Sequence, residues 1–244
     1  MCTVTLLRSE AGLVLTMNRD ELIERDEEEP PRIRTLENGL NWLGPLDPPS
    51  TGTWFGVNEK GVAACLLNRY VEREHEPDEP QSRGALPLLA LSRGNLSDAW
   101  EFVEKDLDLS AYRPFSLILI SVAQTVVLAW EGDTIDVSAS GEKTFHYTSS
   151  SWKREDVLAW RQKMFEHWVE NGCKFTGKLP NHNILCPKGK EAWAPLMRRS
   201  YARTRSICQA RIAADRSEVN VHYWPDTDRH AIDCNVSSSM ELTW

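Results

Sequence analysis

The chain has 244 residues, of which 41% are hydrophobic and 26% charged, and its 28 basic and 36 acidic side chains give a formal net charge of −8. A globular chain of this length can bury a sizeable core, and we expect residues 1–244 to form a single domain. The acidic balance disfavours a nucleic-acid partner, which would attract a basic surface. No run of about 18 apolar residues occurs, and the first residues lack the pattern of a signal peptide. We therefore expect no integral membrane association and a cytoplasmic location.

The N-terminal residues form two strand-like segments joined by a turn-prone one, which predicts a β-hairpin. Its strands are expected over residues 3–7 and 13–17, with a turn at residues 9–12. The polar segment Asn18–Glu21 is expected to end the second strand. An acidic run followed by clustered prolines predicts a loop over residues 24–52.

The rest of the chain alternates between strand-like and helix-like patterns. Strands are expected over residues 53–57, 62–67, 115–122, 125–130, 134–137, 205–213, 219–224 and 231–236. Helices are expected around residues 85–92, after a cap at Asn95 or Ser97, and over residues 154–170, with an irregular or helical segment at 171–200. Short connections favour antiparallel pairing, so we predict an α+β fold of two antiparallel sheets with helices outside. The absence of regular βαβ units and of glycine-rich phosphate motifs disfavours a nucleotide-binding fold.

The metal-ligating residue types show no spacing typical of a metal site. The six cysteines are Cys2, Cys65, Cys173, Cys186, Cys208 and Cys234, with no Cys-x-x-Cys pair among them. The six histidines are His75, His146, His167, His182, His222 and His230. We predict no metal site, no cofactor and no disulfide framework, with most cysteines buried as small apolar residues.

Cys2 is a candidate nucleophile because removal of Met1 would give one residue both a thiol and a free α-amine. An unperturbed α-amine has a pKa of about 7.7–8.0 and accepts a proton near neutral pH. A nearby base or cation activates a thiol. One residue can therefore supply both nucleophile and base, although an ordinary cysteine on an edge strand would fit the same position.

A dense polar cluster, Asn18-Arg19-Asp20-Glu21, follows the second strand of the hairpin. The expected turn brings residues 17–20 opposite residues 2–4. Arg19 is then placed to stabilise a thiolate as a fixed cation. Asp20 is placed to hydrogen-bond the α-amine and orient it. The alternative for such a run of charges is a solvated strand end.

Several short motifs occur together in one order along the chain. After Met1-Cys2 and the Asn-Arg-Asp-Glu cluster, they are Gly52-Thr53-Trp54 with Gly56, the segment GVAACLLN at 61–68, Ser82-Arg83-Gly84, and Thr204-Arg205-Ser206. In this combination the sequence resembles the NRDE family, the transport and Golgi organisation protein 2-like proteins. The resemblance extends from residue 2 to about residue 212 and so covers most of the chain.

This resemblance implies an N-terminal-nucleophile (Ntn) hydrolase fold, a four-layer αββα sandwich similar to that of penicillin V acylase and bile salt hydrolase. It implies that Cys2 is the nucleophile, supported by Arg19 and Asp20. Asn68 matches the family's oxyanion position, where a side-chain amide donates to the developing oxyanion. Arg205 matches a late-strand arginine near the nucleophile, with an ordinary ion pair as its alternative role.

The sequence departs from the acylase relatives ahead of the long helix. They carry a further site asparagine there, whereas this chain has Thr148-Ser149-Ser150-Ser151. A serine hydroxyl can donate in its place, with a different reach. We assign Asn18, Trp54 and Ser149 to substrate binding and expect the loops at residues 24–52 and 70–82 to shape the cleft mouth.

Two functions of different classes fit these residues. The first is a cysteine Ntn hydrolase that cleaves a non-peptide amide or related acyl bond of a small molecule. The second is a non-catalytic protein that binds or traffics a hydrophobic ligand, such as a lipid, acyl-CoA or haem, in the same cleft. A depressed pKa and fast alkylation of Cys2 are expected only of the first. The sequence leaves the substrate and the oligomeric state open.

Overall fold

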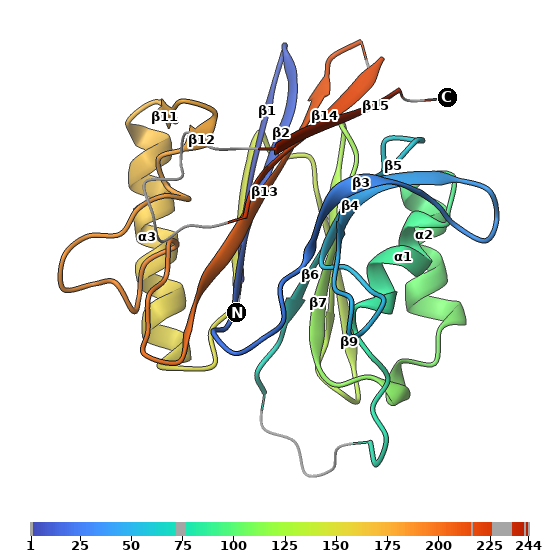
Figure 1. Cartoon of the computed structure of the whole chain (residues 1–244), viewed down its shortest axis with the longest axis horizontal. Helices are drawn as coiled ribbons and strands as arrows, with labels where there is room; N and C mark the ends of the chain where they lie inside the picture. The colour runs from blue at the N-terminus through green and yellow to red at the C-terminus, as the bar shows by residue number, and fades with distance from the viewer. Residues whose placement is uncertain (1, 72–76, 216, 226–235, 242, 244) are drawn as a thin grey trace.

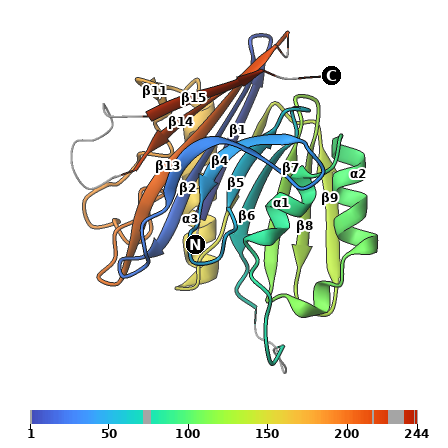
Figure 2. The same cartoon turned by 45° about the vertical axis from the view of Figure 1, so that its right-hand side comes forward.

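Two antiparallel β-sheets face each other in the structure, a computed structural model that describes residues 2–71, 77–215, 217–225, 236–241 and 243. Helix α3 (Arg154–Glu170) covers the outer face of one sheet (Figure 1). Helices α1 (Ala85–Leu91) and α2 (Leu96–Glu101) cover the outer face of the other, as Figure 2 shows. This arrangement confirms the predicted α+β class and the four-layer αββα sandwich.

The strands of the two sheets come from alternating parts of the chain. The first sheet has the order β10-β1-β2-β13-β14-β15, formed by β10 (Thr144–Thr148), β1 (Cys2–Ser9), β2 (Gly12–Leu22), β13 (Ala202–Ala213), β14 (Glu218–Trp224) and β15 (Val236–Glu241). The second has its strands in chain order: β3 (Glu29–Thr35), β4 (Asn41–Leu46), β5 (Phe55–Asn58), β6 (Ala63–Asn68), β7 (Phe115–Ile120), β8 (Thr125–Trp130) and β9 (Ile135–Ser140). A short ribbon pairs β11 (Phe175–Thr176) with β12 (Leu179–Pro180).

The alternation of side chains along β1 divides them between two layers. Val4 and Leu6 are fully buried apolar residues of the main core. Thr3 and Thr5 point the other way, since their hydroxyl groups bond Arg161 of α3 and Asn183 of the loop that follows it. Strand β1 therefore has a partner strand on each side and a covering layer on each face.

Three predicted segments differ in the structure. The segment at residues 24–52 holds β3 and β4 rather than a continuous loop, because Pro30 and Pro31 lie on an edge strand, where the ladder register shifts and no amide donor is needed. The Asn18–Glu21 segment lies inside β2, which continues to Leu22 because it pairs with both β1 and β13. Strand β10 lies in a segment where we expected no strand.

The helices follow the sequence pattern closely. Asn95, one of two expected caps, accepts a 2.9 Å hydrogen bond from the main-chain N–H of Asp98, and α2 passes into a π-helical turn at Phe102–Asp106. The part of the chain that the structure describes has no helix that is long and apolar enough to cross a bilayer. Residues 231–235 of the last expected strand, together with Cys234, His75 and His230, lie outside the described residues.

Helix α3 is fixed to the first sheet by Arg161, whose side chain is completely buried. Its guanidinium donates to the hydroxyl groups of Thr3 (2.8 Å) and Thr148 (2.9 Å) on β1 and β10, and reaches Asp20 of β2 at 3.5 Å. The remaining donors bind the carbonyl oxygens of Trp193 and Ala194, each at 2.8 Å. One side chain therefore joins the helix, three strands and the long loop after α3.

A buried histidine, His182, and a half-buried one, His146, lie in the same layer. The ring centroids of His146 and His182 are 5.0 Å apart, and His182 packs against Phe165 and Trp168. Both ring nitrogens of His182 and Nε2 of His146 have no hydrogen-bond partner among the described residues. The pKa of His146 is lowered to about 4 and that of His182 to about 2; burial is the main cause in both, and the charge of nearby Arg161 contributes less. Both rings are therefore neutral in the folded protein at neutral pH.

Loss of Arg161 should destabilise the fold strongly, because the buried Asp20 would lose the cation of its ion pair. We expect Arg161→Met to lower the free energy of unfolding by about 3–5 kcal/mol. Arg161→Lys should also destabilise, since an ammonium cannot reproduce the planar fork of donors. Urea denaturation measures both. The exposed Lys163→Ala on the same helix is the control, with an expected change within about 0.5 kcal/mol. A cost below about 1 kcal/mol for Arg161→Met would contradict this role.

The two histidines should make the fold acid-labile. Their pKa values are lower in the folded protein than the unfolded value of about 6.5, so the unfolded chain takes up protons first as the pH falls below 6.5. Each should cost roughly 2 kcal/mol of stability at pH 5 relative to pH 7. His182→Phe should flatten the dependence of the unfolding free energy on pH between 7 and 5, whereas the exposed His167→Gln should not. An unchanged slope in His182→Phe would refute this explanation.

Candidate functional site

A cavity of about 550 Å³ opens at the N-terminal end of β1, between the two sheets. Cys2, Arg19 and Asp20 line it from the first sheet, and Asn68 and Trp54 from the second. Its outer wall includes residues of both segments that we expected at the cleft mouth: Arg25, Asp47, Ser50, Pro80 and Gln81. The structure thus brings most of the predicted site residues to one place.

Cys2 is the first described residue, and its position is fixed by main-chain hydrogen bonds. It pairs with Arg19 across the hairpin, as the expected turn required. Its nitrogen donates to the hydroxyl oxygen of Ser149 at 3.2 Å, and its carbonyl accepts from the nitrogen of Ser149 at 3.0 Å. Burial raises the pKa of the Cys2 thiol, opposite to the lowering expected of a preformed thiolate. At neutral pH the sulfur is therefore held as the neutral thiol.

The charge of Arg19 is balanced by acidic side chains rather than directed at a thiolate. Its guanidinium forms ion pairs with Glu28 (2.8 Å) and Asp47 (3.4 Å), and it lies 4.3 Å from the centre of the Trp54 ring. Arg25 binds the second oxygen of Asp47 at 2.5 Å. Arg19 therefore connects the first sheet to the second within the cavity wall, through these ion pairs and the ring contact.

Asp20 points away from Arg19, as alternation along a strand requires. One carboxylate oxygen accepts the hydroxyl of Thr204 at 2.6 Å, and the other lies 3.5 Å from Arg161. Burial raises the pKa of this carboxyl, while Arg161 opposes that change by favouring the ionised form. The side chain of Asp20 is therefore engaged with the layer of α3, and its main chain faces Cys2, to which it is hydrogen-bonded.

Trp54 lines the cavity and carries an unsatisfied buried donor. The side chain is 7% exposed, and its indole N–H has no acceptor among the described residues. Its position depends on Gly52, where an added Cβ would lie 2.5 Å from the carbonyl carbon of Gly84. Only glycine allows this approach, which lets the N–H of Thr53 bind the carbonyl of Gly84 at 2.9 Å. A bound polar ligand would satisfy the indole donor.

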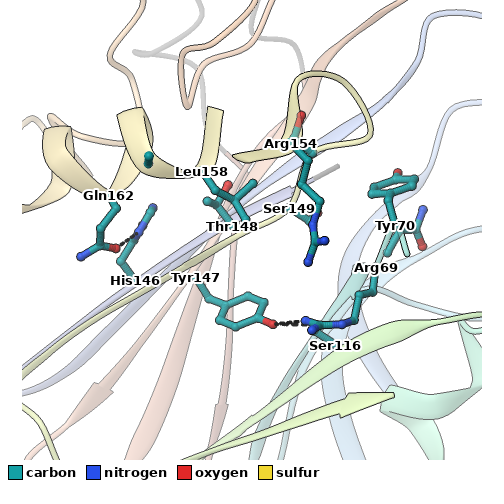
Figure 3. A pocket seen from close by; sticks show the side chains of 13 residues that line it. Arg69, Tyr70, Ser116, His146, Tyr147, Thr148, Ser149, Arg154, Leu158 and Gln162 are labelled. Atoms are coloured by element: carbon teal, nitrogen blue, oxygen red, sulfur yellow. Dashed lines mark hydrogen bonds between the residues drawn. The ribbon is translucent and has the colours of Figure 1, made fainter. Parts of the chain in front are cut away.

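Asn68, the last residue of β6, borders two cavities. The first holds Cys2, and the second, of about 370 Å³, lies towards the start of α3. Figure 3 shows the second cavity, where Ser149 and Arg154 approach from one side and Tyr147 and Arg69 from the other. The side chain of Asn68 hydrogen-bonds Tyr70, which lines the same cavity. A substrate could therefore contact both cavities past Asn68.

Two predicted site residues are not brought to either cavity in the described part of the chain. Asn18 is fully buried, and its amide binds the carbonyl oxygens of Asn183 (2.8 Å) and Pro195 (2.9 Å), so it holds the loop after α3 instead of a ligand. Arg205 lies where the pairing of β13 with β2 shifts register. This bulge turns its guanidinium to the carbonyl oxygens of Leu22, Ile23 and Arg25.

Arg161, which supports the site from the layer of α3, is the residue that sequence reasoning missed. It occupies the buried face of α3 together with Val157, Phe165 and Trp168. An arginine at helical spacing within an apolar stripe indicates a buried polar contact, because a buried arginine requires an acidic or carbonyl partner. The sequence offers many acidic residues, and only the fold selects Asp20.

The described residues hold no cluster of three or more potential metal ligands.

The fold is that of the Ntn hydrolases. The structure resembles the C2A mutant of conjugated bile acid hydrolase from Clostridium perfringens, with a TM-score of 0.56, 11% identity, and coverage of 99% of this chain and 92% of that one. It also resembles the Caenorhabditis elegans N-acylethanolamine-hydrolyzing acid amidase orthologue, with a TM-score of 0.59, 10% identity, and full coverage of both chains. At these identities the likeness concerns the fold alone.

The sequence comparisons identify the family. A curated relative, the uncharacterised protein YGR127W of Saccharomyces cerevisiae, is 32% identical over 101 residues, which cover 38% of this chain and 31% of the relative. The match therefore spans about a third of that protein's length. The family model for transport and Golgi organisation 2 matches residues 1–224. The chain therefore belongs to the transport and Golgi organisation 2 family.

Proposed function

We propose that this protein is a cysteine amidohydrolase of the N-terminal-nucleophile type, acting on a non-peptide amide or related acyl bond of a small molecule. One observation carries the proposal: the residue that would become the N-terminus places its thiol in a cavity while its nitrogen already bonds a hydroxyl group. That residue is Cys2, and the hydroxyl belongs to Ser149. The Ntn fold and the shared cavity of Cys2 and Asn68 support it further.

The proposed reaction requires removal of Met1, which leaves a free α-amine on Cys2. Because burial keeps the thiol protonated, attack on the carbonyl and transfer of the thiol proton to the amine occur together. Ser149 orients the amine through the hydrogen bond that it already accepts. Collapse of the tetrahedral intermediate breaks the carbon–nitrogen bond, and the leaving amine takes the proton. Water then cleaves the thioester and restores the thiol.

The side chains around Cys2 have separate roles in this scheme. Asn68 donates to the oxyanion as the tetrahedral intermediate forms, together with a main-chain N–H. The unpaired indole N–H of Trp54 binds a substrate oxygen. Arg19 holds the indole ring by stacking over it, and Asp20 fixes the end of β2 through Arg161. The two charged residues therefore position the site rather than react.

A non-catalytic role in binding a hydrophobic ligand is the second candidate, and the raised pKa of Cys2 favours it. The lining of the cavity argues against it. Four arginines line this space with three acidic residues: Arg19, Arg25, Arg83, Arg113, Asp20, Glu21 and Asp47. Such a wall suits a polar small molecule better than a lipid, acyl-CoA or haem, because an apolar ligand offers no hydrogen-bonding groups to a lining of this polarity. The hydrolase proposal is therefore preferred.

Cys2 should be processed and acylated. Intact mass and N-terminal peptide mapping of the natively expressed protein should show loss of Met1. Activated acyl esters should then leave a thioester on Cys2, detected by the mass of the N-terminal peptide. Cys2→Ala should abolish both the adduct and turnover of a chromogenic amide panel without unfolding the protein, while Cys186→Ala should retain them. A retained Met1, or undiminished turnover in Cys2→Ala, would refute the mechanism.

Asn68 should be needed for the chemical step. Removal of one oxyanion donor typically lowers kcat about 10²–10³-fold. We therefore expect Asn68→Ala to lower kcat by about this factor, with a smaller change in KM and an unchanged intact mass after Met1 removal. Asn95→Ala, which removes the cap of α2 outside both cavities, controls for general destabilisation. If both variants lose activity in parallel with their Tm, the oxyanion role of Asn68 is wrong.

A further inference from the structure

The cavity beside Asn68 has no acidic wall. Among the described residues that line it, none is an aspartate or a glutamate, in contrast to the cavity of Cys2. Its lining combines two arginines, Arg69 and Arg154, with hydroxyl groups from tyrosine, serine and threonine side chains. A space of about 370 Å³ surrounded by cations and hydroxyl donors suits a ligand that carries negative charge.

Arg69 forms a fixed and internally neutralised part of this wall. It is ion-paired with Glu131, and its Nη1 donates to the hydroxyl of Tyr147 at 3.2 Å. That hydroxyl also shares a 2.8 Å hydrogen bond with Ser116. The side chains are therefore held in place before any ligand arrives, as the dashed line between Arg69 and Tyr147 in Figure 3 indicates.

Arg154 supplies the charge that is not neutralised. It is the first residue of α3, and its side chain runs from the helix into the cavity (Figure 3). The side chain is exposed, and its guanidinium forms no hydrogen bond or ion pair within the described residues. A cation in the first turn of a helix also opposes the helix dipole, so helix stability does not explain an arginine here. The cavity thus presents one free guanidinium to whatever occupies it.

We propose that this second cavity binds a carboxylate, or another singly charged oxyanion, carried by the substrate of Cys2, and that Arg154 is its anchor. The inference rests on the proposed function and narrows its substrate class to amides with an acidic group on one side of the scissile bond. Asn68 connects the two cavities, so one molecule can present its carbonyl to Cys2 and its anionic group to Arg154. Arginine matches such a group because its planar fork donates two parallel hydrogen bonds.

Binding can be tested without turnover, by ¹⁹F NMR titration with 4-(trifluoromethyl)benzoate and with the neutral 4-(trifluoromethyl)benzyl alcohol. The benzoate should bind at least tenfold more tightly than the alcohol, and Arg154→Gln should remove this preference. The neighbouring Lys153→Gln is the matched control, because its ammonium lies over the rings of Trp152 (5.2 Å) and Trp193 (5.9 Å) and outside the cavity lining. Equal affinities in the wild type, or equal effects of the two variants, would overturn the site.

A second measurement tests the connection to Cys2. Bound benzoate should slow alkylation of Cys2 by iodoacetamide in the wild type but not in Arg154→Gln, as followed by peptide mass spectrometry. Benzoate binding without any effect on Cys2 would overturn the assignment to its substrate. Cys2→Ala should still bind benzoate. The binding result therefore does not depend on whether the hydrolase proposal is correct.

Discussion

The candidate site depends on a fully buried arginine in the middle of α3. Arg161 bonds Thr3, the residue after Cys2, and reaches Asp20, the residue after Arg19. It thereby fixes the two strands of the N-terminal hairpin from behind, while the cavity lies in front of them. A cation in this position is tolerated because its donors meet two hydroxyl groups, two carbonyl groups and a carboxylate. The position of Cys2, the proposed nucleophile, is therefore set from the helix layer.

Strand geometry explains why the tetrapeptide Asn18–Glu21 serves two layers. Neighbouring residues of β2 face opposite sides, so Arg19 joins the cavity wall while Asn18 and Asp20 join the layer of α3. Adjacent positions in the sequence thus carry unrelated tasks. Ser149, which directly follows β10, completes the surroundings of Cys2 by bonding both of its main-chain groups. The neutral thiol and its hydroxyl-bound nitrogen fit a nucleophile that loses its proton only as it reacts.

Much of the fold could be predicted from the sequence because local patterns determine it. The hairpin that pairs Cys2 with Arg19, the bounds of α3 and the Asn95 cap all follow from short-range periodicity and capping. Features set by distant partners could not be read this way. Pro30 and Pro31 indicated a loop, although they lie on an edge strand. The bulge at Arg205 turns away a side chain that the motif placed near Cys2. The choice of Asp20 as the partner of Arg161 likewise exists only in three dimensions.

The contact between Gly52 and Gly84 has a mechanical consequence. With no Cβ on either residue, the backbone before Trp54 rests directly on the backbone that leads into α1. Any displacement of the indole would have to move the start of that helix with it. The Trp54 side of the cavity is therefore rigid. Adaptation to differently shaped molecules must come from the wall opposite Trp54. Relatives with other selectivities would then differ by substituted side chains on the Trp54 side and by loops of different length on the opposite wall.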